Sequence, residues 1–157
     1  MQDERYNAVT QQEPGNENSP RVVVTARGED FAQSIQVRHH QLKADEPAAV
    51  GGSDTGPDPY ELLLSSLGAC TSLTVQMYAK RKDWPLEQIE VGLSHHKIHA
   101  RDCEDCESET GYVDIINKSV KLEGALTGEQ EKRLLEIADR CPVQKTLTNE
   151  VKIISDA

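Results

Sequence analysis

The stretch from Pro57 to Ala79 constrains this chain most, because it is the most apolar run in an otherwise polar sequence. Asp58 can cap a helix, Pro59 suits the first helical position, and Glu61 completes a spacing like that of a capping box. Apolar or small residues then recur at helical spacing, namely Leu62, Leu63, Ser66, Leu67, Cys70, Leu73 (or Thr74) and Met77. The pattern predicts one long amphipathic helix with Cys70 in the middle of its buried face.

The residues around Cys70 leave two interpretations open. Its neighbours Gly68, Ala69, Thr71 and Ser72 are small, so another backbone or a substrate could approach the thiol closely. Free cysteine is also among the most buried residue types. From the helix alone, an inert core thiol is the simpler interpretation.

Length and charge narrow the function classes. The 157 residues suit one domain of ordinary size, and the formal net charge of −10 argues against nucleic acid or an anionic membrane surface as a partner. We expect no segment with the length of a membrane span and no secretory signal at the N-terminus. These features predict a cytoplasmic protein with reduced thiols, so its four cysteines favour catalysis or metal binding over a disulfide framework.

The rest of the chain predicts an α+β fold with antiparallel sheet. Residues 1–19 are polar and predict a disordered tail, which leaves residues 20–157 as the folded domain. Strands are expected at 21–26, 31–38, 39–42, 89–99, 112–124 and 150–154, with a connector at 85–88 and helices at about 57–83, at 128–140 after the cap Thr127, and from Pro142 onward.

Cys141 is a second candidate for thiol chemistry. If a short helix begins at Pro142, Cys141 lies at its N-cap, where free backbone N–H groups stabilise a thiolate. Arg140 and Lys145 add positive charge nearby. This context predicts a lowered pKa for Cys141, although the residue could equally fill the junction between two helices.

Cys103 and Cys106 form a C-x-x-C in an acidic loop that follows His95, His96 and His99. With His99 the spacing is compatible with zinc, although a second C-x-x-C is absent. A solvated loop and a surface dithiol that can oxidise are the competing interpretations. The acidic flanks disfavour a reactive thiolate. His39 and His40 are more simply explained as solvent-facing or satisfied side chains.

Two segments of the chain resemble a known family. The run Gly56-Pro57-Asp58-Pro59-Tyr60-Glu61-Leu62-Leu63-Leu64-Ser65-Ser66-Leu67-Gly68-Ala69-Cys70, after Asp45-Glu46-Pro47 and Gly51-Gly52, and the run Ala138-Asp139-Arg140-Cys141-Pro142-Val143 carry the resemblance. They resemble the osmotically inducible protein C and organic hydroperoxide resistance (OsmC/Ohr) family, most of all its OsmC-like branch. The resemblance extends over about residues 22–154.

The resemblance implies an intertwined α+β homodimer in which antiparallel sheet wraps around long central helices. It also implies a thiol-dependent peroxidase without a cofactor. Cys70 would be the peroxidatic cysteine, which attacks the peroxide and becomes a sulfenic acid, and Cys141 the resolving cysteine. The resulting disulfide would be reduced by an external dithiol.

The family site also uses an acid and an arginine, and these carry over unevenly. Glu61 matches the acid of the OsmC-like branch but is displaced by one position from the Ohr-type pattern. Arg27 is our choice for the arginine, with Arg38 and Arg21 as reserves. Two alternatives remain: a non-catalytic metal- or ligand-binding protein that uses His99, Cys103 and Cys106, and a protein with four inert thiols.

Overall fold

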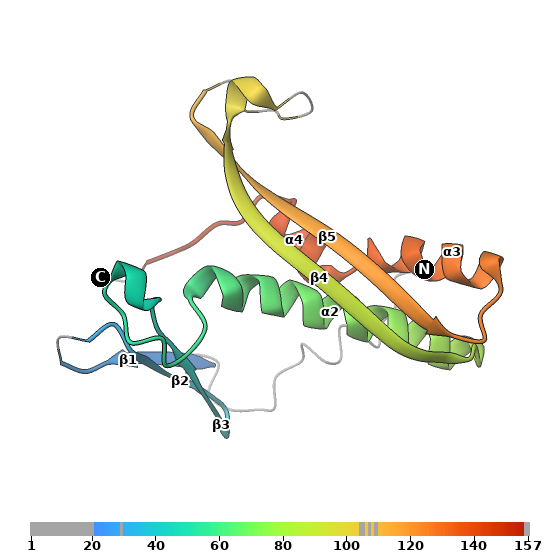
Figure 1. The fold of residues 1–157 in the computed structure, drawn as a ribbon, viewed down its shortest axis with the longest axis horizontal. Helices are drawn as coiled ribbons and strands as arrows, with labels where there is room; N and C mark the ends of the chain where they lie inside the picture. The colour runs from blue at the N-terminus through green and yellow to red at the C-terminus, as the bar shows by residue number, and fades with distance from the viewer. Residues whose placement is uncertain (1–20, 29, 104–105, 107, 109, 156–157) are drawn as a thin grey trace. The chain divides into compact units, whose positions relative to one another are not determined.

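The structure is a computed structural model, and it describes residues 21–28, 30–103, 106, 108 and 110–155 (Figure 1). The predicted N-terminal tail lies outside the described residues. The chain divides into two compact units, one ending at Asp58 and the other beginning at Pro59. Each unit is described by itself below.

The first unit contains a three-stranded antiparallel sheet in the order β1–β2–β3. Its strands are β1 (Val22–Ala26), β2 (Gln33–Val37) and β3 (His40–Ala44). Val24 pairs with Ile35, and Ile35 pairs with Leu42, which fixes the register. The hairpin expected from the β-branched runs is confirmed. The boundaries differ by one or two residues, most at the start of β2, which is Gln33 rather than Phe31, and at the end of β3, which is Ala44 rather than Leu42.

Asp45 organises the segment that follows β3 and the short 3-10 helix η1 (Ala48–Val50). Its side chain, only 2% exposed, accepts bonds from the backbone N–H groups of Glu46, Ser53 and Thr55 and from the Thr55 hydroxyl. The backbone N–H of Thr55 contributes most to a lowered pKa of this carboxyl, against the opposing effect of burial. One buried carboxylate therefore fixes the conformation of the loop that leads to the long helix.

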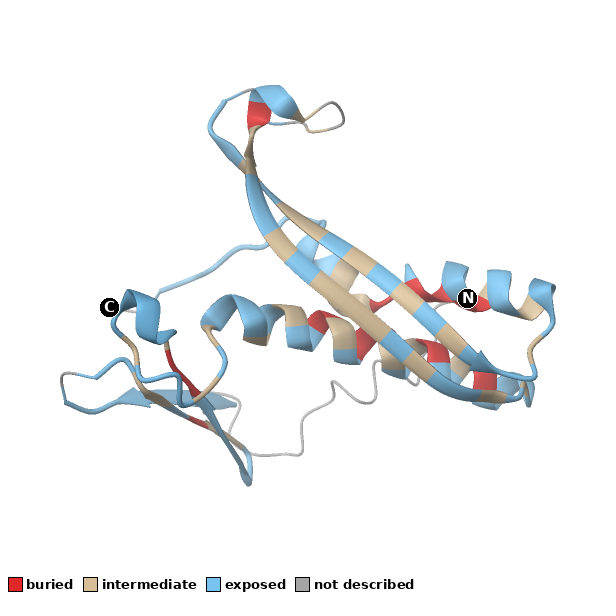
Figure 2. Ribbon diagram, in the orientation of Figure 1, coloured by how far each residue is buried: buried red, intermediate tan, exposed pale blue. Residues whose placement is uncertain are grey.

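The second unit begins with the 24-residue helix α2 (Pro59–Lys82). It starts at the predicted proline, and Lys80, Arg81 and Lys82 occupy its last turn, where cations suit the helix dipole. By length and composition alone α2 could cross a membrane, so the expectation that no segment has that length was wrong. The burial pattern of α2 and its packing against β4, α3 and α4 are those of a core helix (Figure 2).

A long antiparallel hairpin covers one side of α2. Its strands are β4 (Leu86–His99) and β5 (Tyr112–Gly124), paired from Leu86 with Gly124 to His99 with Tyr112. The predicted connector at 85–88 is thus already strand from Leu86. Gly68 permits the close approach of the hairpin to α2, since a Cβ at this position would lie 3.1 Å from Leu93 Cδ1.

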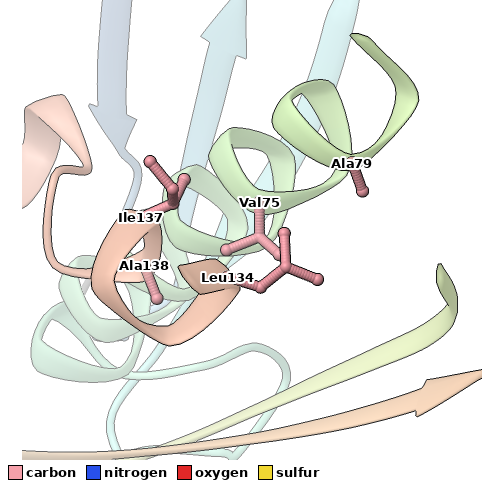
Figure 3. Close-up of a cluster of buried hydrophobic side chains, with 5 residues drawn as sticks. All are labelled: Val75, Ala79, Leu134, Ile137 and Ala138. Atoms are coloured by element: carbon pink, nitrogen blue, oxygen red, sulfur yellow. The ribbon is translucent and has the colours of Figure 1, made fainter. Parts of the chain in front are cut away.

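The main core lies between α2 and α3 (Gly128–Ala138). Thr127 and Gln130 form the predicted capping box at the start of α3, and the helix ends at Ala138, two residues before the predicted end. Val75 and Leu134, both 0% exposed, point toward one another between the two helices (Figure 3). Trp84, Leu86, Ile89, Val120, Leu122 and Leu126 pack around this cluster. The short helix α4 (Pro142–Leu147) follows α3 as predicted.

Two sequence predictions about burial and pairing were wrong. Leu63, Leu73 and Met77 are 37%, 54% and 44% exposed, because the buried face of α2 runs through Leu67, Cys70, Thr71, Val75 and Ala79. The predicted strand at 150–154 is not formed, and Ile153 and Ile154 are exposed. A strand needs a partner for its backbone groups, and the described part of this single chain offers none at this segment.

Candidate functional site

Cys70 and Cys141 meet in the core of the second unit. Cys70 lies on the buried face of α2 and is 7% exposed, whereas Cys141 lies at the N-cap of α4 and is 0% exposed. Both are free thiols, and their side chains are hydrogen-bonded to each other. The fold therefore brings together two cysteines that are far apart in the sequence.

The pKa of Cys141 is raised, so the prediction of a lowered value was wrong. Burial of the thiol contributes most to this rise, followed by its hydrogen bond to Cys70. The backbone N–H of Gln144 does lower the pKa, as a helix N-terminus should, but the effect is smaller. Arg140 and Lys145, expected to help, are exposed. Cys141 therefore holds its proton more firmly than an ordinary thiol does.

Thr71 is a member of this site that the sequence analysis did not single out. Its side chain is fully buried, and its hydroxyl has no conventional hydrogen-bond partner among the described residues. The hydroxyl nevertheless lies beside the Cys141 sulfur and lowers the pKa of that thiol. A weak contact that falls short of a full hydrogen bond to a neutral thiol, but strengthens toward a thiolate, accounts for both observations.

Lys118 on β5 holds the junction that carries Cys141. Its Nζ donates to the Ala138 carbonyl (3.3 Å), to Asp139 Oδ1 (2.9 Å) and to Gln144 Oε1 (2.5 Å). Its side chain is only 15% exposed. These bonds connect the end of α3 to the first turn of α4, so they fix Cys141 from both sides. The sequence gives no local signal for this role, because Lys118 is distant from the junction along the chain.

Of the two other predicted site residues, Glu61 lies far along α2 from the thiol of its own chain. Glu61 precedes Cys70 by nine positions on α2, about 13 Å along the helix axis at the usual rise per residue. Such a separation exceeds the reach of one side chain within the same chain. Arg27 is exposed and belongs to the first unit, as do the reserves Arg21 and Arg38.

Cys103 and Cys106 form a disulfide, with Cα atoms 5.5 Å apart. This differs from the expectation that all four cysteines stay reduced. The nearby histidines have other partners: His99 Nδ1 accepts from the Arg101 backbone N–H, and His95 Nε2 lies 2.7 Å from Asp114 Oδ1. Among the residues that the structure describes, no group of three His, Cys, Asp or Glu side chains could hold a metal ion.

Two buried thiols that are hydrogen-bonded to each other, one on a long helix and one at the N-terminus of a short helix, have the arrangement that a two-cysteine redox site requires. The comparisons with known proteins identify the family. The profile described as OsmC-like protein matches residues 51–156. The chain belongs to the OsmC-like family.

Solved structures of similar fold include three bacterial proteins. An OsmC-like protein from Mycoplasma pneumoniae has a TM-score of 0.63 and 19% identity, covering 84% of this chain and 89% of that one. The organic hydroperoxide resistance protein OhrB of Bacillus subtilis has a TM-score of 0.55 and 22% identity, covering 81% of this chain and 90% of that one. An organic hydroperoxide resistance protein from Elizabethkingia anophelis has a TM-score of 0.58 and 16% identity, covering 85% of this chain and 91% of that one. No curated protein sequence matches this chain.

These likenesses confirm the α+β fold with antiparallel sheets and a long helix. The family includes proteins described as organic hydroperoxide resistance proteins, which associates it with peroxide defence. The intertwined dimer, the external reductant and the roles of individual residues stay predictions.

Proposed function

We propose that this protein is a thiol-dependent peroxidase that reduces organic hydroperoxides or hydrogen peroxide. The observation that carries the proposal is the contact between the two free thiols of Cys70 and Cys141 in the core. A thiol pair in contact can pass from dithiol to disulfide with little backbone movement. Membership of a family with hydroperoxide resistance proteins supports the choice of peroxide as oxidant.

Cys70 is the proposed nucleophile. Its thiolate attacks the outer peroxide oxygen, the O–O bond breaks, and the leaving alkoxide or hydroxide takes a proton to depart as alcohol or water. The sulfur is left as a sulfenic acid. The Cys141 sulfur, which carries its proton until this stage, then attacks the sulfenic sulfur and water leaves. An external dithiol reduces the disulfide and closes the cycle.

Glu61 and Arg27 retain their proposed roles in orienting the thiolate. Because Glu61 is too far along α2 from Cys70 of its own chain, we place it at the thiol of a second copy. The exposed side chains of Leu63, Leu73 and Met77 on α2 support a surface that such a copy would cover. The family resemblance implies this dimer.

Peroxide consumption with dithiothreitol as reductant tests the proposal. We expect Cys70→Ser to lose about a thousandfold or more of the wild-type rate, because the nucleophile is gone. Cys141→Ser should react once and then over-oxidise at Cys70, detected by mass spectrometry. A Cys103→Ser/Cys106→Ser double variant is the matched control and should keep the wild-type rate. Retention of that rate by Cys70→Ser would refute the proposal.

A further inference from the structure

Thr71 on α2 has a fully buried hydroxyl that forms no conventional hydrogen bond with any residue that the structure describes. Buried polar atoms are nearly always hydrogen-bonded, because leaving one without a partner costs free energy. Valine has the same shape without the hydroxyl, and it would suit a buried position one turn before the core residue Val75. The fold therefore tolerates a polar group at position 71 that packing alone does not require.

Several other hydroxyls in the helices are used differently. Ser66, Thr74 and Thr146 each donate to a backbone carbonyl three or four positions earlier, at 2.7, 2.7 and 3.1 Å. This bond is the usual local partner of a helical serine or threonine. Thr71 does not form it. Its hydroxyl is therefore available to a group outside its own helix.

The group beside the Thr71 hydroxyl is the Cys141 sulfur. Cys141 lies at the N-cap of α4, and its thiol is hydrogen-bonded to Cys70, the residue before Thr71 on α2. The backbone N–H of Gln144 approaches the same sulfur from the first turn of α4. Two donors, one from each helix, thus converge on a thiol that is fully buried.

The charged side chains at this junction are paired with each other or exposed to solvent. They are Lys118 and Asp139, whose charged groups lie 2.9 Å apart, and the exposed Arg140 and Lys145. The titratable group in contact with the Cys141 thiol is Cys70. Hydrogen bonds are therefore the main stabilisation that the site offers to a negative charge on the Cys141 sulfur.

The second step of the proposed cycle needs such donors. As the Cys141 sulfur attacks the sulfenic sulfur of Cys70, the S–S bond forms and the S–O bond breaks. The Cys141 proton passes to the departing hydroxide, which leaves as water. Burial opposes negative charge on Cys141 as this proton leaves. A donor that is unsatisfied in the resting dithiol but satisfied at this moment lowers the barrier, because it favours the transition state over the ground state.

We propose that Thr71 donates a hydrogen bond to the Cys141 sulfur as the disulfide forms, and so determines how much of Cys70 is resolved rather than over-oxidised. The inference rests on the proposed function and assigns a residue to its second step. A sulfenic acid that is not resolved reacts with a second peroxide and becomes a sulfinic acid, which a dithiol does not reduce. Loss of the Thr71 hydroxyl should leave the first step intact and increase this side reaction.

Thr71→Val tests the proposal with little change in side-chain volume. Reduced protein is mixed with tert-butyl hydroperoxide, quenched, and analysed by mass spectrometry for sulfenic acid, disulfide and sulfinic acid. We expect the Cys70–Cys141 disulfide to form about tenfold more slowly and more Cys70 to be over-oxidised, while sulfenic acid forms at the wild-type rate. The free energy of unfolding should be unchanged or higher, because an unsatisfied hydroxyl is removed. A wild-type rate of disulfide formation would overturn the proposal.

Two matched variants separate the hydroxyl from the packing. Thr71→Ser keeps the hydroxyl and should retain most of the wild-type rate of disulfide formation. Thr74→Val removes a hydroxyl that is bonded to the Cys70 carbonyl, and it should leave the rate unchanged. If Thr71→Ser is as slow as Thr71→Val, or if Thr74→Val slows the step equally, the effect is one of packing and the proposal is wrong.

A titration keeps this proposal distinct from the peroxidase proposal. The variant used is Cys70→Ser/Cys103→Ser/Cys106→Ser, which leaves one thiol. The ionisation of that thiol, Cys141, is followed by the ultraviolet absorbance of the thiolate, corrected with the same variant carrying Cys141→Ser. Adding Thr71→Val should raise the pKa of Cys141, because a donor to the thiolate is lost. An unchanged pKa would refute the role of Thr71 even if peroxide is consumed. A raised pKa in a protein that consumes no peroxide would support the hydrogen bond and refute only the peroxidase proposal.

Discussion

Cys70 and Cys141 reach each other only because two helices pack together in the core, whereas Cys103 and Cys106 are three positions apart at the end of a hairpin. The first pair is buried and reduced, and the second is partly exposed and oxidised. The surroundings of each pair decide which reagents can reach it. Only small reagents can reach a buried pair, whereas larger reagents can also reach a partly exposed one.

This contrast depends on how firmly each pair is held. The core pair relies on long-range packing, represented by Leu134 and by the bonds of Lys118. The hairpin pair relies on neighbours along the chain, such as Ala100, whose carbonyl accepts from the Cys103 N–H. Perturbing the core should therefore affect one pair and spare the other.

Leu134→Ala should give the largest effect. Removal of a fully buried side chain that packs on Val75 should lower the free energy of unfolding by about 2–5 kcal/mol, measured by denaturant titration. In reduced protein, alkylation of Cys141 should accelerate while that of Cys103 stays unchanged. Leu135→Ala, at a side chain 44% exposed, is the control. Equal acceleration at Cys103 would contradict the separate stability of the two pairs.

Lys118→Met should have an intermediate effect. It keeps the long apolar stem but removes the bonds to Ala138, Asp139 and Gln144, so stability should fall by roughly 1–3 kcal/mol. The Cys70–Cys141 disulfide should also form more slowly after peroxide treatment, as followed by mass spectrometry.

Lys121→Met provides the matched control on the same strand, because Lys121 is 72% exposed and pairs with Glu90 at the surface. It should leave both measurements close to wild type. If both variants slow disulfide formation alike, Lys118 has no particular part in positioning Cys141.

The smallest effect should be a pH dependence. The raised pKa of Cys141 means that the unfolded chain releases this proton at lower pH than the folded protein. Stability should accordingly fall as pH rises from the ordinary thiol pKa toward the raised value. In Cys70→Ala the fall should weaken, because the hydrogen bond is lost but burial remains. An unchanged profile in that variant would contradict coupling between the two thiols.

Local sequence signals predicted the elements well. The proline at position 59, the capping box at Thr127 and the apolar–polar alternation in 89–95 each act through neighbouring residues, and all three gave the observed structure. The segment 150–154 has an equally good strand pattern but forms no strand. Its outcome depends on a partner, which no local pattern specifies.

The site was predictable only in part, for the same reason. Helical spacing put Cys70 on a buried face, and Pro142 put Cys141 at a helix start, as observed. The sign of the Cys141 pKa shift was missed, because burial depends on packing from elsewhere in the chain. Lys118 and Thr71 were missed because their contacts are made in space, without a motif.

The hairpin also has a consequence for the order of folding. Its paired residues are between 13 and 38 positions apart, and the pairs nearest the loop close at a modest cost in loop entropy. The contact between Cys70 and Cys141 closes a much longer loop and requires α2, α3 and α4 to be in place. During oxidative refolding, Cys103 and Cys106 should therefore pair first. Early pairing would prevent these two thiols from forming wrong disulfides with Cys70 or Cys141 while the core cysteines are still apart.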